Sequence, residues 1–322
     1  MNQFFPIQKS TLSAHAIGEH VAQAFDLAEP VRCRLLTQTV NDMYLIETLS
    51  TSFVYRIWRH AAKTLNSLET ILEVQFQLSR QDLPVVCPIP LPSGNYLQTL
   101  NAPEGQRPAA LFSFASGQPA GREITAAQSF VAGQLTANLH LLADTLAPSP
   151  DLLIHDVEFL LLEPYNVIRN CKATNEEQIE SLEVIVSNLR QRVSNLDKTA
   201  PLFGICHGDV HGMNVLFDEE QVTLLDFDWL SYSWRAWDLA VFVWWIRGVE
   251  DEAKVKQAFL DGYHSVQPRA EAIVGSIPIF VPIRHLLLTS SIITNAEQGI
   301  NVGRWIDKAF IEKRLRFIQT WM

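Results

Sequence analysis

Cysteine, basic charge and uninterrupted apolar runs are all scarce in this 322-residue sequence. The widely spaced cysteines include no C-x-x-C pair, which argues against a disulfide framework and indicates a reducing compartment. They are Cys33, Cys87, Cys171 and Cys206. The formal net charge is −10, which argues against a nucleic-acid partner, because binding nucleic acid requires a basic surface that neutralises phosphates.

The two longest apolar runs do not predict a membrane span. Residues 239–249 are too few to cross a bilayer, and residues 277–293 carry Arg284 and His285 near their middle, where a charge in lipid is costly. The first ten residues lack the basic segment and apolar core of a secretory signal. We therefore expect a cytoplasmic protein with no membrane partner.

The first third of the chain is predicted to be rich in β-strands. Strand-like runs lie at 31–38, 43–49 and 52–60, and an amphipathic helix is predicted over 64–81. Prolines favour an extended segment after this helix, and two further strands are predicted at 95–100 and 109–115.

The character changes near residues 113–118, and the remainder is predicted to be mostly helical. Long helices are expected over 122–144 and 174–193, the second with Thr174 as its N-cap. A small β-region follows at 201–227, and helices return from Trp234. The pattern predicts an α+β protein in which a small β-rich lobe precedes a larger helical lobe.

The densest polar cluster is "CHGDVHGMNVLF", Cys206 to Phe217. One interpretation is a zinc site, since two histidines lie four residues apart, but Gly208 and Gly212 interrupt any helix there. The other interpretation is a loop that closes a strand and is followed by two short strands. Asp209, Asn214 and Asp226 then stand at strand ends, where two hard oxygen ligands suit Mg²⁺ and a third carboxylate can orient a hydroxyl nucleophile.

The spacing H-G-D-x-H-x-x-N, followed by D-F-D at 226–228 and W-D-L-A at 237–240, resembles a known family. It is similar to the phosphotransferases that include aminoglycoside kinases, choline kinases and type II homoserine kinases. The resemblance implies a bilobal protein-kinase-like fold. Its parts would be a nucleotide-binding N-lobe (1–112), a hinge (113–118) and a catalytic, substrate-binding C-lobe (119–322).

The resemblance also implies a role for each residue of the central motifs. Asp209 would be the catalytic carboxylate, and Asn214 and Asp226 would bind Mg²⁺. Asp228 would contact a second metal ion or only the loop. Three residues would support the loop, namely His207, His211 and Asp238, although Asp238 could instead be the N-cap of the next helix.

The N-lobe is expected to bind the nucleotide. Arg56 stands where kinases place a phosphate-binding lysine; the alternative is an ordinary exposed strand arginine. Glu73, one helical turn after Glu69, is the expected partner of Arg56. Thr39 and Asn41 occupy the phosphate loop, whose segment "TQTVNDMY" contains no glycine. The backbone around Ser113 to Ala115 would bind adenine.

The substrate side is less defined by sequence. Arg284 either forms a salt bridge in the core or lines the substrate pocket. The first 117 residues have a net charge of −1 and the rest −9, so the acidity of the second lobe either solvates its surface or attracts a cation. Tryptophans at 229, 234, 237, 244 and 245 are expected in the core, or in a cage for a quaternary amine.

We therefore predict an ATP- and Mg²⁺-dependent phosphotransferase. The acceptor would be the hydroxyl of a small metabolite that is homoserine-, choline- or aminoglycoside-like, with an amine or an amino acid among the candidates. The alternatives are a Ser/Thr protein kinase of the bacterial stress-kinase type and a nucleotide-binding pseudokinase regulator. The sequence does not indicate the oligomeric state.

Overall fold

The computed structural model describes residue 5 and the ranges 7–27, 31–61, 63–219, 221–267, 269–299 and 305–322. The chain divides into two compact units. Unit 1 comprises the residues up to Gln118, Ala147–Leu152 and Leu216–Asp228. Unit 2 comprises Pro119–Leu146, Leu153–Val215 and Trp229–Met322. Two segments of the expected C-lobe (119–322), Ala147–Leu152 and Leu216–Asp228, thus group with unit 1.

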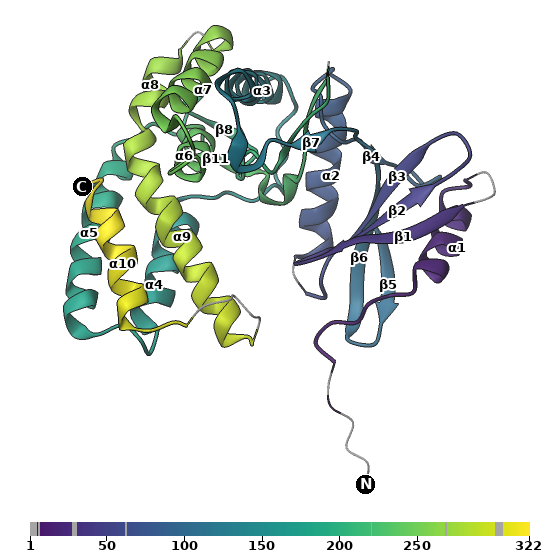
Figure 1. Ribbon diagram of the computed structural model, residues 1–322, viewed down its shortest axis with the longest axis horizontal. Coiled ribbons are helices and arrows are strands. Elements are labelled where there is room, and N and C mark those ends of the chain that lie inside the picture. The colour runs from purple at the N-terminus through teal and green to yellow at the C-terminus, as the bar shows by residue number, and fades with distance from the viewer. Residues whose placement is uncertain are drawn as a thin grey trace. The chain divides into compact units, whose positions relative to one another are not determined.

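Unit 1 contains an antiparallel sheet with a helix on each face (Figure 1). The sheet order is β1-β2-β3-β6-β4, and β5 pairs with β6. The elements are α1 (Ala14–Ala24), β1 (Arg32–Gln38), β2 (Asp42–Glu47), β3 (Ser52–Ile57), α2 (Leu65–Ser79), β4 (Pro88–Ile89), β5 (Gln98–Ala102) and β6 (Gly105–Ser113), before β7 (Gln118–Pro119) at the boundary. Helix α1 and strand β4 are additions to the expected order of three strands, one helix and two strands.

Alternating side chains of the sheet build the two cores of unit 1. Residues such as Tyr55, Ile57 and Leu111 pack with Ile17 and Val21 of α1. Their neighbours on the opposite face pack with α2; this second cluster comprises Trp58, Leu68, Leu72, Tyr96, Ala110 and Phe112. Because successive side chains of a strand point to opposite faces, one strand can serve both helices.

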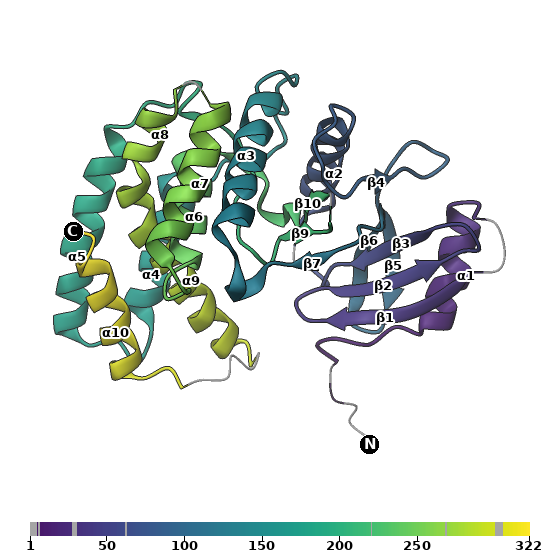
Figure 2. The same cartoon turned by 45° about the horizontal axis from the view of Figure 1, so that its top comes forward.

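Unit 2 is mainly helical (Figure 2). Its helices are α3 (Ala126–Ala143), α4 (Glu163–Asn170), α5 (Glu176–Ser194), α6 (Ala236–Trp245), α7 (Glu252–Val266), α8 (Ala270–Gly275), α9 (Ile277–Glu297) and α10 (Lys308–Gln319). Short helical turns of unit 2 occur at Gly121–Glu123 and Glu158–Leu162 (a π-helix). Its strands are β8 (Phe203–Cys206) and β11 (Ser231–Trp234). Strand β10 (Val222–Leu224) belongs to unit 1, whereas β9 (Val215–Phe217) and the helical turn Phe227–Trp229 cross the unit boundaries.

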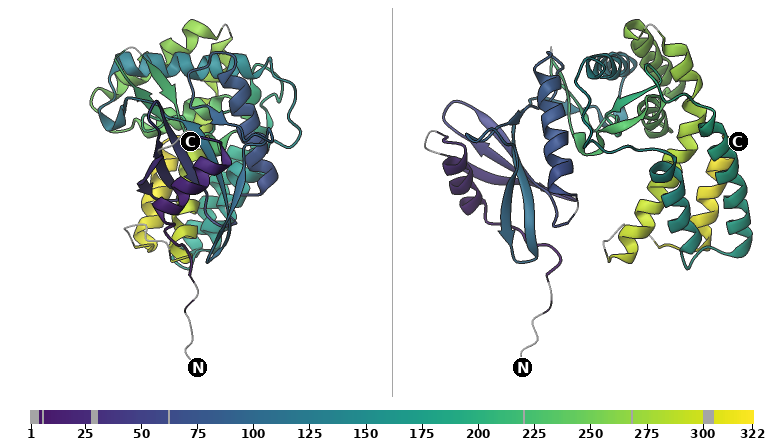
Figure 3. Two further views of the ribbon diagram at one scale, coloured as in Figure 1. Left: turned by 90° about the vertical axis from the view of Figure 1, so that its right-hand side faces the viewer. Right: turned by 180° about the vertical axis from the view of Figure 1, so that it is seen from behind.

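Helix α3 packs extensively against α7 in unit 2, and α5 lies beside α10 (Figure 3). The α3–α7 crossing is unusually close. A Cβ atom on Gly133 would lie 2.0 Å from the Phe259 carbonyl oxygen, and one on Gly262 would lie 2.0 Å from the Phe130 carbonyl oxygen. Glycine is therefore required at both positions for the backbones to approach this closely.

Two details of the helices correct the sequence predictions. The N-cap of α5 is Asn175, which forms a reciprocal capping box with Gln178, whereas Thr174 uses its hydroxyl on the Ile168 carbonyl. In α6 the N-cap position belongs to Arg235, and Asp238 lies inside the first turn. The alternative role of Asp238 as an N-cap is therefore wrong.

Helix α9 is the one helix of the described residues that is long and apolar enough to cross a membrane. In its most apolar stretch, 67% of the residues are buried inside the protein. Mostly buried core helices of soluble proteins have the same length and apolar composition. Arg284, in the middle of α9, binds a carboxylate of the neighbouring loop. The helix therefore behaves as a packed element of unit 2.

Candidate active site

The loop after β8 carries one group of the predicted site residues. Strand β8 pairs antiparallel with β11, with Cys206 opposite Ser231, so the loop starts from a buried strand end. Gly208 has a φ of +85°, and a Cβ atom there would lie 2.4 Å from the Trp229 carbonyl oxygen. Only glycine combines this left-handed backbone with so close an approach.

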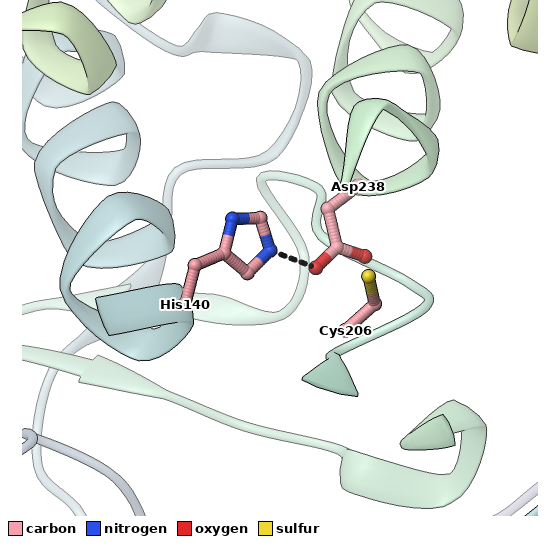
Figure 4. Close-up of side chains that lie close together, drawn as sticks. All are labelled: His140, Cys206 and Asp238. Atoms are coloured by element: carbon pink, nitrogen blue, oxygen red, sulfur yellow. Dashed lines mark hydrogen bonds and ion pairs between the residues drawn. The ribbon is translucent and has the colours of Figure 1, made fainter. Parts of the chain in front are cut away.

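Asp238 holds this loop through its backbone. Its carboxylate accepts hydrogen bonds from the N–H groups of His207 (2.8 Å) and Gly208 (2.7 Å). It also accepts one from Nε2 of His140 at 3.0 Å (Figure 4). Burial acts to raise the pKa of Asp238, but the bond from His140 and the backbone bonds lower it below its usual value. A buried carboxylate with these donors is a rigid anchor for the loop.

Cys206, His140 and Asp238 are the group of described residues that could hold a metal ion, with ligand atoms within 4.8 Å of one another. Their donors are already in use, since both Asp238 oxygens accept N–H bonds and His140 Nδ1 lies 2.9 Å from the Tyr263 hydroxyl. Burial raises the pKa of the Cys206 thiol well above its usual value. A thiol that stays protonated is a poor ligand, so this cluster is a hydrogen-bond network.

Asp209 lies at the turn of the loop with its side chain 16% exposed. One carboxylate oxygen accepts a hydrogen bond from Nη2 of Arg284 at 2.5 Å, and the other lies 3.3 Å from Nε2 of His211. His211 Nδ1 accepts the N–H of Met213, so its proton lies on Nε2, facing Asp209.

These contacts keep Asp209 ionised. Burial acts to raise its pKa, but the charge of Arg284 and the interactions with His211 and His207 hold it well below its usual range. His211 itself is stacked on the Trp245 ring, at a centroid distance of 5.8 Å. His211 therefore contacts the carboxylate directly, in addition to the structural role expected for it.

Asn214 completes the group of predicted site residues on the loop after β8. Its side chain is turned so that Nδ2 donates to the backbone oxygen of Asp209 at 3.0 Å and to a carboxylate oxygen at 3.4 Å. All hydrogen bonds recorded for the side chain use this nitrogen, which leaves the amide oxygen available to a cation. Residue 214 is nevertheless 92% buried, so its orientation is well defined.

A second group of predicted site residues lies within unit 1. Nη1 of Arg56 is 3.0 Å from Asp226, and Nη2 binds Asp228. Leu224 connects this segment to unit 1, because its N–H donates to the Pro84 carbonyl at 2.8 Å. Asp226 has a left-handed backbone with a φ of 58°, a strained conformation found often at functional positions.

The two aspartates have different surroundings. The Asp228 carboxylate accepts hydrogen bonds from Trp58 Nε1 (2.9 Å) and Asn41 Nδ2 (3.1 Å), besides the one from Arg56. Asp226 is 38% exposed, against 17% for Asp228. Asp226 is therefore the carboxylate that is open to a metal ion, whereas Asp228 fixes the side chains around it.

Lys63 is a functional candidate that the sequence analysis missed. Its ammonium group donates to the backbone oxygen of Asp228 at 2.6 Å, beside Asp226 and Arg56. Its pKa is lowered, chiefly by burial, although Asp228 acts in the opposite direction. The signal was weak because a single lysine between a strand and a helix resembles any surface lysine.

The expected pairing of Arg56 with Glu73 is wrong, because Asp226 and Asp228 occupy the terminal nitrogens of Arg56. Glu73 instead accepts a long hydrogen bond from Gln77, at 3.4 Å. Glu69, the other candidate on the same helix, accepts the backbone N–H groups of residues 96 and 97. The partners of Arg56 are instead Asp226 and Asp228, which lie 170 and 172 residues after it in the sequence.

The other predicted nucleotide-binding residues are distributed over unit 1. Asn41 joins the Asp228 cluster, whereas Thr39 contributes only backbone bonds, accepting from Lys9 at 2.8 Å and donating to Asn41. The N–H and hydroxyl of Ser113 are both bonded to Cys87. Ala115 lies just beyond β6, and no hydrogen bond between described residues involves its backbone groups.

The profile of the phosphotransferase enzyme family matches residues 33–273. The chain belongs to this family. It is 32% identical to an uncharacterised protein of Synechocystis sp. over 265 residues. The aligned region covers 82% of this chain and 73% of that protein. A homoserine kinase of Agrobacterium fabrum is 25% identical over 248 residues, which is 74% of this chain and 72% of that one.

Solved kinase structures share the fold. A microcompartment-associated aminopropanol kinase aligns with a TM-score of 0.76 at 19% identity, covering 95% of both chains. An amicoumacin kinase in complex with AMP-PNP, Ca²⁺ and amicoumacin aligns with a TM-score of 0.78 at 16% identity, covering 96% of this chain and 94% of that one. The predicted kinase-like α+β fold is thus confirmed, and the protein is a phosphotransferase.

Proposed function

We propose that this phosphotransferase transfers the γ-phosphate of ATP to the hydroxyl group of a small metabolite, with Mg²⁺ as the metal ion. The observation that carries the proposal is the Asp209 carboxylate, which is ionised, partly exposed and fixed at the end of a braced loop. The similarity to a homoserine kinase and an aminopropanol kinase supports an acceptor with a hydroxyl group.

Asp209 would accept a hydrogen bond from the substrate hydroxyl and direct its oxygen toward the phosphate. Because the pKa of Asp209 is so low, it acts mainly by orientation and takes the proton as the new bond forms. The anchor formed by Asp238 and His140 keeps the loop from relaxing during this step.

The residues present fit a hard divalent ion. The free amide oxygen of Asn214 and the exposed carboxylate of Asp226 are the oxygen ligands that Mg²⁺ prefers. When bound, the ion would neutralise charge on the nucleotide phosphates. Arg56 and Lys63 would bind the phosphates themselves, with Asp228 orienting the Arg56 guanidinium.

The adenine would lie against the backbone after β6. Within the described part of the chain, no hydrogen bond uses the N–H or carbonyl of Ala115, whereas Ser113 is bonded to Cys87. We assign the base contact to Ala115 for this reason.

The assignment is tested with an ATP-turnover assay over a panel of alcohols, comparing wild type with Asp209→Asn. The variant removes the negative charge but keeps the shape of the side chain, and activity is expected to fall by roughly 10²- to 10⁴-fold. Asp261→Asn is the matched control, because Asp261 is exposed on α7 and bonded only to Gln257. Equal activity of wild type and Asp209→Asn would contradict the assignment.

The same assay separates the alternatives. Phosphate transfer to protein in a cell extract, with no transfer to metabolites, would indicate a protein kinase. Thermal stabilisation by ATP without any transfer would indicate a pseudokinase.

A further inference from the structure

Arg284 is an unusual residue for its position in α9. It is 6% exposed, lies in the middle of an apolar helix and places its guanidinium 5.9 Å from the centre of the Trp237 ring. Its one recorded hydrogen bond is made by Nη2 to the carboxylate of Asp209. A buried cation therefore stands directly beside the proposed catalytic group.

The hydrogen-bonding capacity of Arg284 is largely unused. Its Nε is buried without a partner, and no acceptor among the described residues binds its Nη1, which is not fully buried. The Nε atoms of two other buried arginines, Arg56 and Arg235, also lack a partner, but each of these side chains uses both terminal nitrogens on carboxylates. Nη1 of Arg284 is therefore a terminal donor open to a ligand, and a charge-assisted hydrogen bond to an anion is favoured there.

Two basic side chains contact the Asp209 carboxylate. Nη2 of Arg284 binds one oxygen, and Nε2 of His211 lies 3.3 Å from the other. The residue after Arg284, His285, packs on the Phe317 ring, which Arg247 also contacts from 4.1 Å. A cationic acceptor would meet like charge here, although the C-terminal region as a whole is acidic.

We propose that Arg284 is the anion-binding residue of the acceptor site, and that the acceptor is a short-chain hydroxy carboxylate or hydroxy amino acid. The substrate hydroxyl lies on Asp209 and its carboxylate on Nη1 of Arg284. Arginine suits this task because its planar fork can bind two anions at once, one on each terminal nitrogen. The inference rests on the proposed kinase function and names its substrate class.

Three matched acceptors with the same terminal hydroxyl test the inference: 4-hydroxybutyrate, homoserine and 3-aminopropan-1-ol. Wild type is expected to favour the two carboxylates over the amino alcohol. Arg284→Met slows every acceptor, because Asp209 loses its partner, but it also lowers the ratio of kcat/KM for carboxylate over amine by roughly 10- to 100-fold. Arg284→Lys keeps part of the preference, and Arg190→Met, on the exposed face of α5, leaves the ratio unchanged.

A binding experiment separates this inference from the kinase assignment. Butyrate and 2-aminobutyrate lack the reacting hydroxyl, and calorimetry is expected to show that they bind wild type but not Arg284→Met, whereas propylamine binds neither. ATP binding to Arg284→Met serves as the check of folding, because the proposed phosphate-binding residues lie in unit 1. Carboxylate binding that depends on Arg284 supports the anion site even if no transfer occurs. Transfer to amines with an unchanged ratio in Arg284→Met overturns the anion site and leaves the kinase assignment intact.

Discussion

Asp209 keeps its negative charge because three basic side chains outweigh the effect of its burial. Its pKa in the folded protein lies below the usual value of about 3.9, so its ionisation stabilises the fold above that pH, and this contribution is lost as the pH falls further. Activity of the wild type should therefore show no acid limb from Asp209 in the neutral range.

Replacing Arg284 by methionine removes the largest favourable charge and leaves burial to act. We expect the pKa of Asp209 to rise and an acid limb to appear at higher pH in the profile of kcat/KM for an uncharged alcohol. The uncharged acceptor serves as the control, since its binding does not need Arg284. An unchanged pH profile in Arg284→Met would show that Arg284 does not control the ionisation of Asp209.

Asp226 and Asp228 are two residues apart but have different predicted roles. Asp226→Asn removes the exposed carboxylate, so we expect ATP affinity to lose its dependence on Mg²⁺. Asp228→Asn disturbs the orientation of Arg56, Trp58 and Asn41, so ATP binding weakens while the dependence on Mg²⁺ remains. Calorimetric titration of ATP at several Mg²⁺ concentrations distinguishes the two. Loss of Mg²⁺ dependence in Asp228→Asn but not in Asp226→Asn would reverse the assignment.

At the scale of the helices, the crossing of α3 and α7 depends on two glycines. Gly133→Ala places a Cβ atom 2.0 Å from the Phe259 carbonyl, so the helices must separate. We expect a loss of about 2 kcal/mol or more in the free energy of unfolding. Gly275→Ala is the matched control, because a Cβ atom there meets nothing within 4 Å and alanine favours the helix. Chemical denaturation measures both; equal stability of the two variants would show that the crossing adjusts freely.

The elements predicted from sequence were those with a strong local pattern. The helix expected over 64–81 corresponds to α2, because apolar residues recur at helical spacing throughout it. Helix α1 was missed because its sequence is short and rich in small and polar residues, and it owes its position to the sheet. A Cβ atom on its Gly18 would lie 2.9 Å from the Cys33 side chain, a closeness that only the folded sheet imposes.

At the scale of the whole molecule, the chain crosses between its units more often than the sequence indicates. The segment Leu216–Asp228 belongs to unit 1, where its two aspartates bind Arg56. Local patterns predicted Asp226 and Asp228 as site residues but could not indicate their partner, because tertiary structure alone brings residues 170 positions apart into contact. The motif residues were therefore predictable, and the ion pairs among them were not.

The central claim is that an ionised Asp209 directs a substrate hydroxyl toward the phosphate of ATP. The most direct measurement is mass-spectrometric detection of phosphorylated product from ATP and a metabolite extract, with wild type and Asp209→Asn side by side. The account predicts a phosphomonoester with wild type and at least about 100-fold less with Asp209→Asn. Equal product from both proteins would contradict it.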